Sequence, residues 1–475
     1  MVAETEHMKH QAAYIHTALI LTGCLAALVT VSCDGLWPAA ELPVVWPQLR
    51  TAIRGFGYNV TADDVNGDGV DDLVIASPVA GTFPRAYAGD LHLLLGPQPS
   101  DSIAEAADLT VEAQTPVRYA GAGLAMAEMS GDGRRDVVSS ALLGSPWENM
   151  GHHFDPNGGS VYVIDSSLRG RRALEGSAFL TLEGPASFGA AMAAVDYNGD
   201  GQEDLAAACP LRAEVYVVYG PRSGVLTMPE DADVVIRGPS GAFGSGLAAA
   251  DVDERGCGEL VVSDYINNAI YVVPGGLSGE QAVEDVALVA VRSDDPDVLA
   301  YAATVADLTG DGRCELIVAA RLANSETVGR LFVIRGPLRG ELSLQKDSVL
   351  VLDDVDRGQR QISVDVSGPV DGGPALLAIG LSGRRHLPES NKYGEVWVIP
   401  GDLQGRYGLN DVDSPPFAWR LKVTELDDAS LDRLGTVVLF AETQEAGRVD
   451  LVVSARVIES DPQDFGQVMV FSLER

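Results

Sequence analysis

The chain has 475 residues, 46% of them hydrophobic, so it is long enough to bury a large core. Its formal net charge of −35 at pH 7 argues against nucleic acids and anionic lipid surfaces as partners, because both carry negative charge. Glycine is frequent (52 residues) and aromatic residues make up only 6%, which favours short strands joined by tight turns over long helices.

The N-terminal segment reads as a secretion signal. Two acids within residues 1–6 do not suit the start of a signal, so Met8 is favoured as the true start. The apolar run from about Thr17 to Val31 fits a secretory hydrophobic region and is short for a membrane span. We therefore predict a signal at residues 1–33, a linker at 34–41 and one domain at 42–475.

Two cysteines leave the processing of this segment open. Cys33 follows Thr30-Val31-Ser32 at the end of the apolar run, in a pattern that resembles the lipobox of bacterial lipoproteins, and we favour it as the lipidated first residue. Cys24 is closer to the lipobox in its preceding residues, and ordinary cleavage near Ala39 or Ala40 and an uncleaved anchor are further alternatives. Each predicts export, to the outer membrane, cell surface or periplasm, with the N-terminal anchor as the only membrane contact.

From residue 42 onward, one unit recurs seven times. In each unit a strand leads into a nine-residue loop, an apolar run follows, and a second alternating strand comes after a connector of variable length. The loops begin at Asp64, Glu128, Asp196, Asp251, Asp307, Ser367 and Glu442. Such repetition predicts an all-β monomer, a seven-bladed β-propeller of four-stranded antiparallel blades. The apolar stretch at 42–46 is expected to complete the last blade and close the ring.

Four of these loops share the pattern acid, any residue, small polar, any residue, Asp, Gly, any two residues, acid. Oxygen ligands at alternate positions, with glycine at position 6, suit a tight loop around calcium, so about four ions are expected. The side chains at positions 1, 3, 5 and 9 and the carbonyl at position 7 are the predicted ligands: Asp64, Asn66, Asp68, Val70 and Asp72; Glu128, Ser130, Asp132, Arg134 and Asp136; Asp196, Asn198, Asp200, Gln202 and Asp204; Asp307, Thr309, Asp311, Arg313 and Glu315. The alternative is a hydrogen-bonded turn without metal.

The other three loops depart from the pattern. In the fourth, Arg255 stands at position 5, where its guanidinium could replace the cation and pair with Asp251, Asp253 and Glu259. The sixth and seventh loops, which begin at Ser367 and Glu442, lack ligands at several positions, so no metal is expected in any of the three.

Phe-Gly pairs at 56, 188 and 243 each stand eight residues before a loop, and Ala76-Ser77-Pro78 and Ala208-Cys209-Pro210 follow two of the loops. These residues resemble the FG-GAP repeats of integrin α-subunit head domains and their bacterial relatives, over roughly residues 42–475. The resemblance implies a seven-bladed propeller with calcium in some of the loops between first and second strands. It does not imply integrin function, because one fold serves many functions.

A ligand surface is expected on the face opposite these loops, where connectors between second and third strands lie. Two long connectors concentrate basic and aromatic residues: Trp147, His152, His153 and Phe154 in one, and Arg384, Arg385, His386 and Tyr393 in the other. We predict that this face binds a protein or glycan. The alternative is that these segments are tolerated surface insertions.

Neither a Ser-His-Asp or Cys-His arrangement nor a zinc-type spacing is evident in the sequence, so we predict a non-enzymatic binding or adhesion module. Two alternatives stay open. One is a polysaccharide- or phosphoester-cleaving enzyme on a propeller scaffold, because family relatives carry such domains. The other is a purely structural envelope protein.

Overall fold

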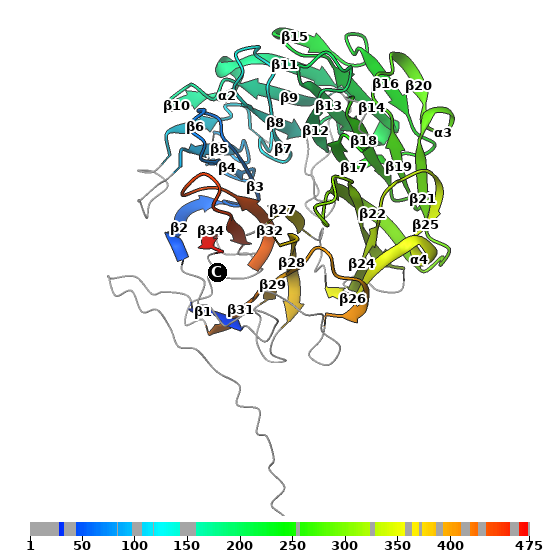
Figure 1. Ribbon diagram of the computed structural model, residues 1–475. Helices are drawn as coiled ribbons and strands as arrows, with labels where there is room; N and C mark the ends of the chain where they lie inside the picture. The colour runs from blue at the N-terminus through cyan, green and yellow to red at the C-terminus, as the bar shows by residue number, and fades with distance from the viewer. Residues whose placement is uncertain are drawn as a thin grey trace, which may run out of the picture.

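A computed structural model describes residues 28–32, 44–82, 84–96, 107–116, 118–142, 158–252, 257–323, 328–356, 363–369, 373–385, 393–409, 419–425, 434–456 and 465–473. The protein is an all-β propeller, as the sequence predicts: sheets stand side by side around a ring (Figure 1). Within the described ranges, no helix is long and apolar enough to cross a membrane.

Five of the sheets have five strands each, and the strands of each sheet are given in the order in which they pair. The first holds β10 (Gly170–Ala173), β6 (Leu109–Glu112), β5 (Asp90–Leu94), β4 (Asp72–Ser77) and β3 (Asn59–Asp63). The second holds β15 (Gly224–Thr227), β11 (Ala178–Gly184), β9 (Gly159–Ile164), β8 (Asp136–Leu142) and β7 (Leu124–Ala127). The third holds β12 (Met192–Val195), β13 (Asp204–Cys209), β14 (Glu214–Val218), β16 (Val234–Arg237) and β20 (Gly279–Ala282).

The fourth holds β17 (Phe243–Ala250), β18 (Glu259–Asp264), β19 (Ala269–Val273), β21 (Val289–Arg292) and β25 (Gly340–Ser343). The fifth holds β22 (Val298–Ala306), β23 (Glu315–Leu322), β24 (Val328–Ile334), β26 (Ser348–Asp356) and β30 (Gly405–Gly408). The remaining sheet has nine strands: β1 (Leu28–Ser32), β31 (Trp419–Glu425), β29 (Tyr393–Pro400), β28 (Ala375–Arg385), β27 (Ser363–Pro369), β32 (Leu434–Ala441), β33 (Asp450–Arg456), β34 (Phe465–Ser472) and β2 (Val44–Arg54).

The expectation of seven four-stranded blades is wrong, because the described strands form six sheets and none has four strands. The extra rim strand of each five-stranded sheet is donated by the following unit and pairs in parallel, as Gly279–Ala282 does with Val234–Arg237. The strands that flank the sixth and seventh loops share the nine-stranded sheet, joined where Gly394 of β29 lies against Leu434 of β32.

Short helical turns follow three of the rim strands: α2 (Leu174–Ser177), α3 (Val283–Val286) and α4 (Leu344–Asp347), while η2 (Pro210–Arg212) connects β13 to β14. Leu174, Val283 and Leu344 are the buried residues of the three turns. Each turn thus anchors the rim strand before it to the sheet of its own unit through one buried apolar side chain.

The glycines that open the third strands explain how neighbouring units approach so closely. A Cβ on Gly159 would lie 2.3 Å from the carbonyl oxygen of Phe188 in the next unit, and a Cβ on Gly394 would lie 2.2 Å from the backbone nitrogen of Leu434. At Gly466 the contact is with the carbonyl oxygen of Phe56, at 1.7 Å, so the last unit meets the first in the same way. No side chain fits at these positions.

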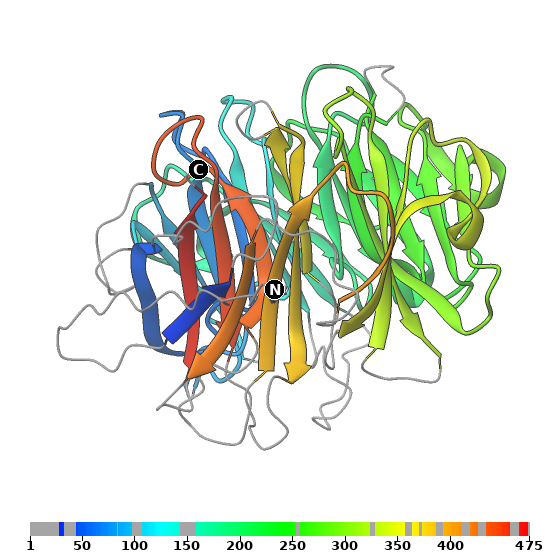
Figure 2. The same cartoon turned by 60° about the horizontal axis from the view of Figure 1, so that its bottom comes forward.

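The N-terminal and C-terminal strands of the domain also meet at this point of the ring. β2 pairs antiparallel with β34, so the strand that the sequence places at the N-terminal end of the domain lies beside the C-terminal strand, as expected (Figure 2). Leu28–Ser32, inside the segment interpreted as a secretion signal, pairs antiparallel with β31. The signal itself and its processing at Cys33 stay predictions, since Cys33 lies outside the described residues.

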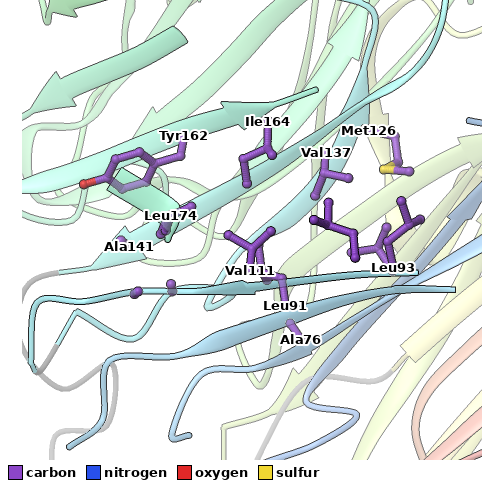
Figure 3. Packing of buried hydrophobic residues seen from close by; sticks show 14 of the residues in the cluster. Ala76, Leu91, Leu93, Val111, Met126, Val137, Ala141, Tyr162, Ile164 and Leu174 are labelled. Carbon is purple, nitrogen blue, oxygen red and sulfur yellow. The ribbon is translucent and has the colours of Figure 1, made fainter. Parts of the chain in front are cut away.

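The core lies between neighbouring sheets. Figure 3 shows one such layer, in which Leu91 and Leu93 of the first sheet face Val137 and Ile164 of the second. The Phe-Gly pairs that recur in the sequence contribute to this packing, because Phe56, Phe188 and Phe243 are fully buried. Their rings lie 6.0, 5.7 and 6.0 Å from the rings of the third-strand residues His92, Tyr216 and Tyr271.

Candidate metal-binding loops

The four loops predicted to bind calcium each join a first strand to a second strand. In each case the residue before the loop pairs with the acid at position 9: Asp63 with Asp72, Ala127 with Asp136, Val195 with Asp204, and Ala306 with Glu315. The shared register places all four loops at the same end of their sheets, which is the expected loop face.

The acid at position 9 is buried and closes the loop through a hydrogen bond to the start of the loop. Its carboxylate accepts the backbone N–H of position 2, from Val65 to Asp72 at 3.1 Å and from Leu308 to Glu315 at 2.9 Å. The second and third loops make the same bond, from Met129 to Asp136 at 3.0 Å and from Tyr197 to Asp204 at 2.9 Å. The position 9 acid therefore has a structural role that requires no metal.

The acid at position 1 collects backbone N–H groups from the turn. In the third loop, Asp196 accepts from Gly199, Asp200 and Gly201 at 2.8, 3.1 and 2.8 Å. Asp64 and Asp307 accept the equivalent three bonds in their own loops. Glu128 accepts two backbone N–H groups, from Gly131 and Asp132, and the Ser130 hydroxyl, all through Oε1.

The position 5 carboxylates are exposed, and each accepts the N–H of position 7; Asp200 accepts from Gln202 at 2.8 Å. Within the described part of the chain, no three His, Cys, Asp or Glu side chains already stand where one metal ion could be held. Closing a loop on a cation therefore requires the exposed carboxylate of Asp68, Asp132, Asp200 or Asp311 to turn toward its neighbours.

The fifth loop shows whether its residues suit a calcium ion. Thr309 Oγ1 at position 3 and Glu315 Oε1 at position 9 are both buried and have no hydrogen-bond partner. A weak ion pair joins that Glu315 oxygen to Arg335 Nε at 3.9 Å. Buried oxygens without a donor carry a desolvation cost, and both are atoms that the loop pattern assigns to calcium. The donor set of this loop thus fits a hard cation.

The buried carboxylates at position 9 have raised pKa values. Burial, with a smaller contribution from loop acids such as Asp68 and Asp200, raises the pKa of Asp72 and of Asp136 to about 7 and that of Asp204 to about 6. Burial also raises the pKa of Glu315. A bound divalent cation would act in the opposite direction, by favouring the ionised carboxylates.

The loops predicted to lack metal keep part of the same structure. Glu259 accepts the N–H of Val252 at 2.7 Å, and Asp450 accepts the Thr443 hydroxyl at 2.6 Å. In the sixth loop, Ser367 Oγ accepts the N–H of Leu376 at 2.9 Å. The Arg255 substitution stays a prediction, because Asp253 and Arg255 lie outside the described residues.

The predicted ligand face is described only in part. Trp147, His152, His153, Phe154 and His386 lie outside the described residues. Arg384 and Arg385 lie in β28, and the backbone of Arg385 pairs with that of Tyr393 in β29.

The sequence reading missed exposed apolar side chains on this face. Leu211 and Ile266 are each 60% exposed, in connectors between second and third strands, and Tyr265 stands next to Ile266 with the Arg321 guanidinium 5.9 Å from its ring centre. These connectors are too short to stand out in the sequence.

Comparison with known proteins gives matches to FG-GAP repeats, to integrin α chains and to a phospholipase D. The FG-GAP repeat family matches residues 56–94. Integrin alpha pat-2 of Caenorhabditis briggsae is 27% identical over 268 residues (48% of this chain, 20% of that protein), and integrin alpha-IIb of Homo sapiens is 29% identical over 239 residues (46% and 20%). Phosphatidylinositol-glycan-specific phospholipase D of Rattus norvegicus is 31% identical over 170 residues (31% and 20%). The chain thus covers about a fifth of the length of these relatives, and the matches support an FG-GAP β-propeller.

Proposed function

We propose that this chain is a calcium-stabilised, non-enzymatic binding or adhesion module that acts outside the cytoplasm, with a protein or glycan ligand on the face opposite the loops. The observation that carries the calcium part is in the fifth loop, where Thr309 Oγ1, a buried oxygen without a hydrogen-bond partner, stands at a predicted ligand position. The FG-GAP match and the similarity to integrin α chains support a binding role.

Isothermal titration of the chelator-treated protein with calcium tests the metal part. About four sites are expected, with dissociation constants on the order of 10⁻⁴–10⁻³ M, as in other extracellular modules. Asp311→Ala should remove the fifth-loop site, whereas Glu445→Gln, at an exposed position of the seventh loop, should leave the stoichiometry unchanged. Two sites or fewer in the unmodified protein would contradict the assignment.

The ligand part is tested by binding to a glycan array and to a panel of immobilised extracellular proteins, in calcium and in chelator. Exchange of Trp147 and Arg384 for alanine together should abolish any binding found, and Arg172→Ala, an exposed arginine on β10, serves as the control. Unchanged binding by the double variant would remove this face from consideration.

The match to phospholipase D favours an enzyme less than the integrin matches favour a binding module, since it spans 31% of this chain, against 48% and 46% for the two integrin chains. An activity screen on phosphoesters and polysaccharides separates the two functions: turnover by the purified protein would replace the binding proposal.

A further inference from the structure

The nine-residue loops of neighbouring units contact one another through the residue at position 8. This residue stands between the predicted carbonyl ligand at position 7 and the acid at position 9. Asp71 of the first loop donates its N–H to the carbonyl of Glu442, the first residue of the seventh loop, at 2.9 Å, and its Oδ2 accepts the Glu442 N–H at 2.7 Å. The two residues are 371 positions apart.

The same relation recurs around the ring. Glu203 of the third loop accepts the N–H of Glu128, the first ligand of the second loop, at 2.9 Å. Gly258 of the fourth loop donates its N–H to the carbonyl of Asp196 at 2.8 Å, and Cys314 Sγ of the fifth loop lies 3.9 Å from the carbonyl oxygen of Asp251. In each pair, position 8 of one loop meets position 1 of the loop before it.

Arg135, at position 8 of the second loop, joins three loops at once. Its Nε lies 2.8 Å from Asp63 Oδ2, and its Nη1 pairs with Glu203 Oε2. Asp63 directly precedes the first ligand of the first loop and accepts the Asp64 N–H at 3.0 Å. Glu203 directly precedes Asp204, the last ligand of the third loop. All three side chains are about one-third exposed or less, so the ion pairs are only partly screened.

We infer that calcium binding in the first, second and third loops is cooperative, and that Arg135 is the positioning residue that couples them. The inference rests on the proposed calcium function. When a cation orders Asp64 in the first loop, Asp63 is fixed with it and holds Arg135. Arg135 in turn fixes the backbone between positions 7 and 9 of the second loop and holds Glu203 beside the third. Each filled loop then lowers the ordering cost of the next.

A double-mutant cycle with calcium as the only probe tests this coupling. Asp68→Asn replaces a carboxylate ligand of the first loop with a neutral amide and weakens that site, and calorimetry measures the affinity of the other sites. In the otherwise unmodified protein this change should weaken those sites about fivefold, at the low end of typical coupling between sites. In the Arg135→Gln background the weakening should fall below about twofold, and Arg135→Lys should restore part of it.

Two further variants separate coupling from a general loss of structure. Arg172→Gln removes one positive charge from β10 and should leave the fivefold effect unchanged. Glu203→Gln breaks the ion pair but keeps an oxygen for the Glu128 N–H, so it should reduce the coupling even if Arg135→Gln fails to fold.

The outcomes distinguish this inference from the function on which it rests. Absence of calcium binding by the unmodified protein overturns both. Calcium binding in which Asp68→Asn leaves the other sites unaffected overturns the coupling alone. A fivefold effect that persists in Arg135→Gln and in Glu203→Gln removes Arg135 as the coupling residue.

Discussion

Positions 5 and 9 of a loop should respond differently to the loss of their negative charge. In the third loop, Asp200 is exposed, whereas Asp204 is buried and accepts N–H groups from Tyr197, Asn198 and Gly220 at 2.9, 3.0 and 2.9 Å. We expect Asp200→Asn to affect stability only when calcium is present. We expect Asp204→Asn to affect stability in its absence as well.

The magnitudes follow from these contacts. In chelator near pH 7 the ionised form of Asp204 costs stability, because burial raises its pKa to about 6, and an Asn amide keeps one acceptor oxygen, so Asp204→Asn should gain about 1–3 kcal/mol there. Asp200→Asn should change stability in chelator by less than about 0.5 kcal/mol, as for other exposed substitutions. At calcium about 100-fold above the dissociation constant, the unmodified site should add about 2.7 kcal/mol, which both variants lose.

The assay is urea unfolding followed by tryptophan fluorescence, in chelator and in calcium, with Glu445→Gln of the seventh loop as the charge-matched control. A calcium-dependent gain that survives in Asp200→Asn would refute the assignment of position 5 as a ligand. An Asp204→Asn protein only as stable as the unmodified one in chelator near pH 7 would refute the cost of burying the ionised carboxylate at position 9.

Three further predictions concern the core. Burial lowers the pKa of His92 to about 4, so only the unfolded imidazole takes a proton between pH 6.5 and pH 4, and stability should be lost as pH falls through this range. His92→Phe should reduce the difference in unfolding free energy between about pH 7 and pH 4.5 by about 3 kcal/mol, as measured by urea titration. Burial raises the pKa of Asp365 to about 6, and its carboxylate accepts the Phe440 N–H at 2.7 Å. The ionised form therefore costs stability above pH 6, and Asp365→Asn should gain about 1–3 kcal/mol at about pH 8 but little near pH 4 in the same assay. Phe243→Ala should lower the unfolding free energy by about 3–5 kcal/mol in urea titrations, because its ring is fully buried against Tyr271, whereas a loss below about 1 kcal/mol would contradict this packing.

Short-range patterns predicted the loops and the strands beside them. The apolar run 73–76 lies within β4 (Asp72–Ser77), and the run beginning at Gly159 is β9 (Gly159–Ile164), because alternation and loop spacing are local properties of the chain. The rim strands could not be predicted in this way. All four residues of Gly170–Ala173 are exposed, so no alternation marks them, and they form a strand only because β6 of the preceding unit pairs with them. The fusion at Gly394 and Leu434 likewise depends on a long-range backbone contact.

The acid at position 9 shows why a ligand pattern alone overestimates what it says about metals. Glu259 and Asp450 stand in loops that are not expected to bind calcium, yet both are buried and accept a hydrogen bond from the start of their loop, as Asp72 does in the first loop. The hydrogen bond that closes the loop is therefore a sufficient reason for an acid at position 9, with or without a metal ion. The side chains that indicate a cation are those that do not close the loop. They are the exposed carboxylate at position 5 and a buried oxygen such as Thr309 Oγ1, to which no group donates a hydrogen bond. By this criterion the fifth loop has the strongest case for calcium, although Glu315 is longer than the Asp at position 9 of the other three loops.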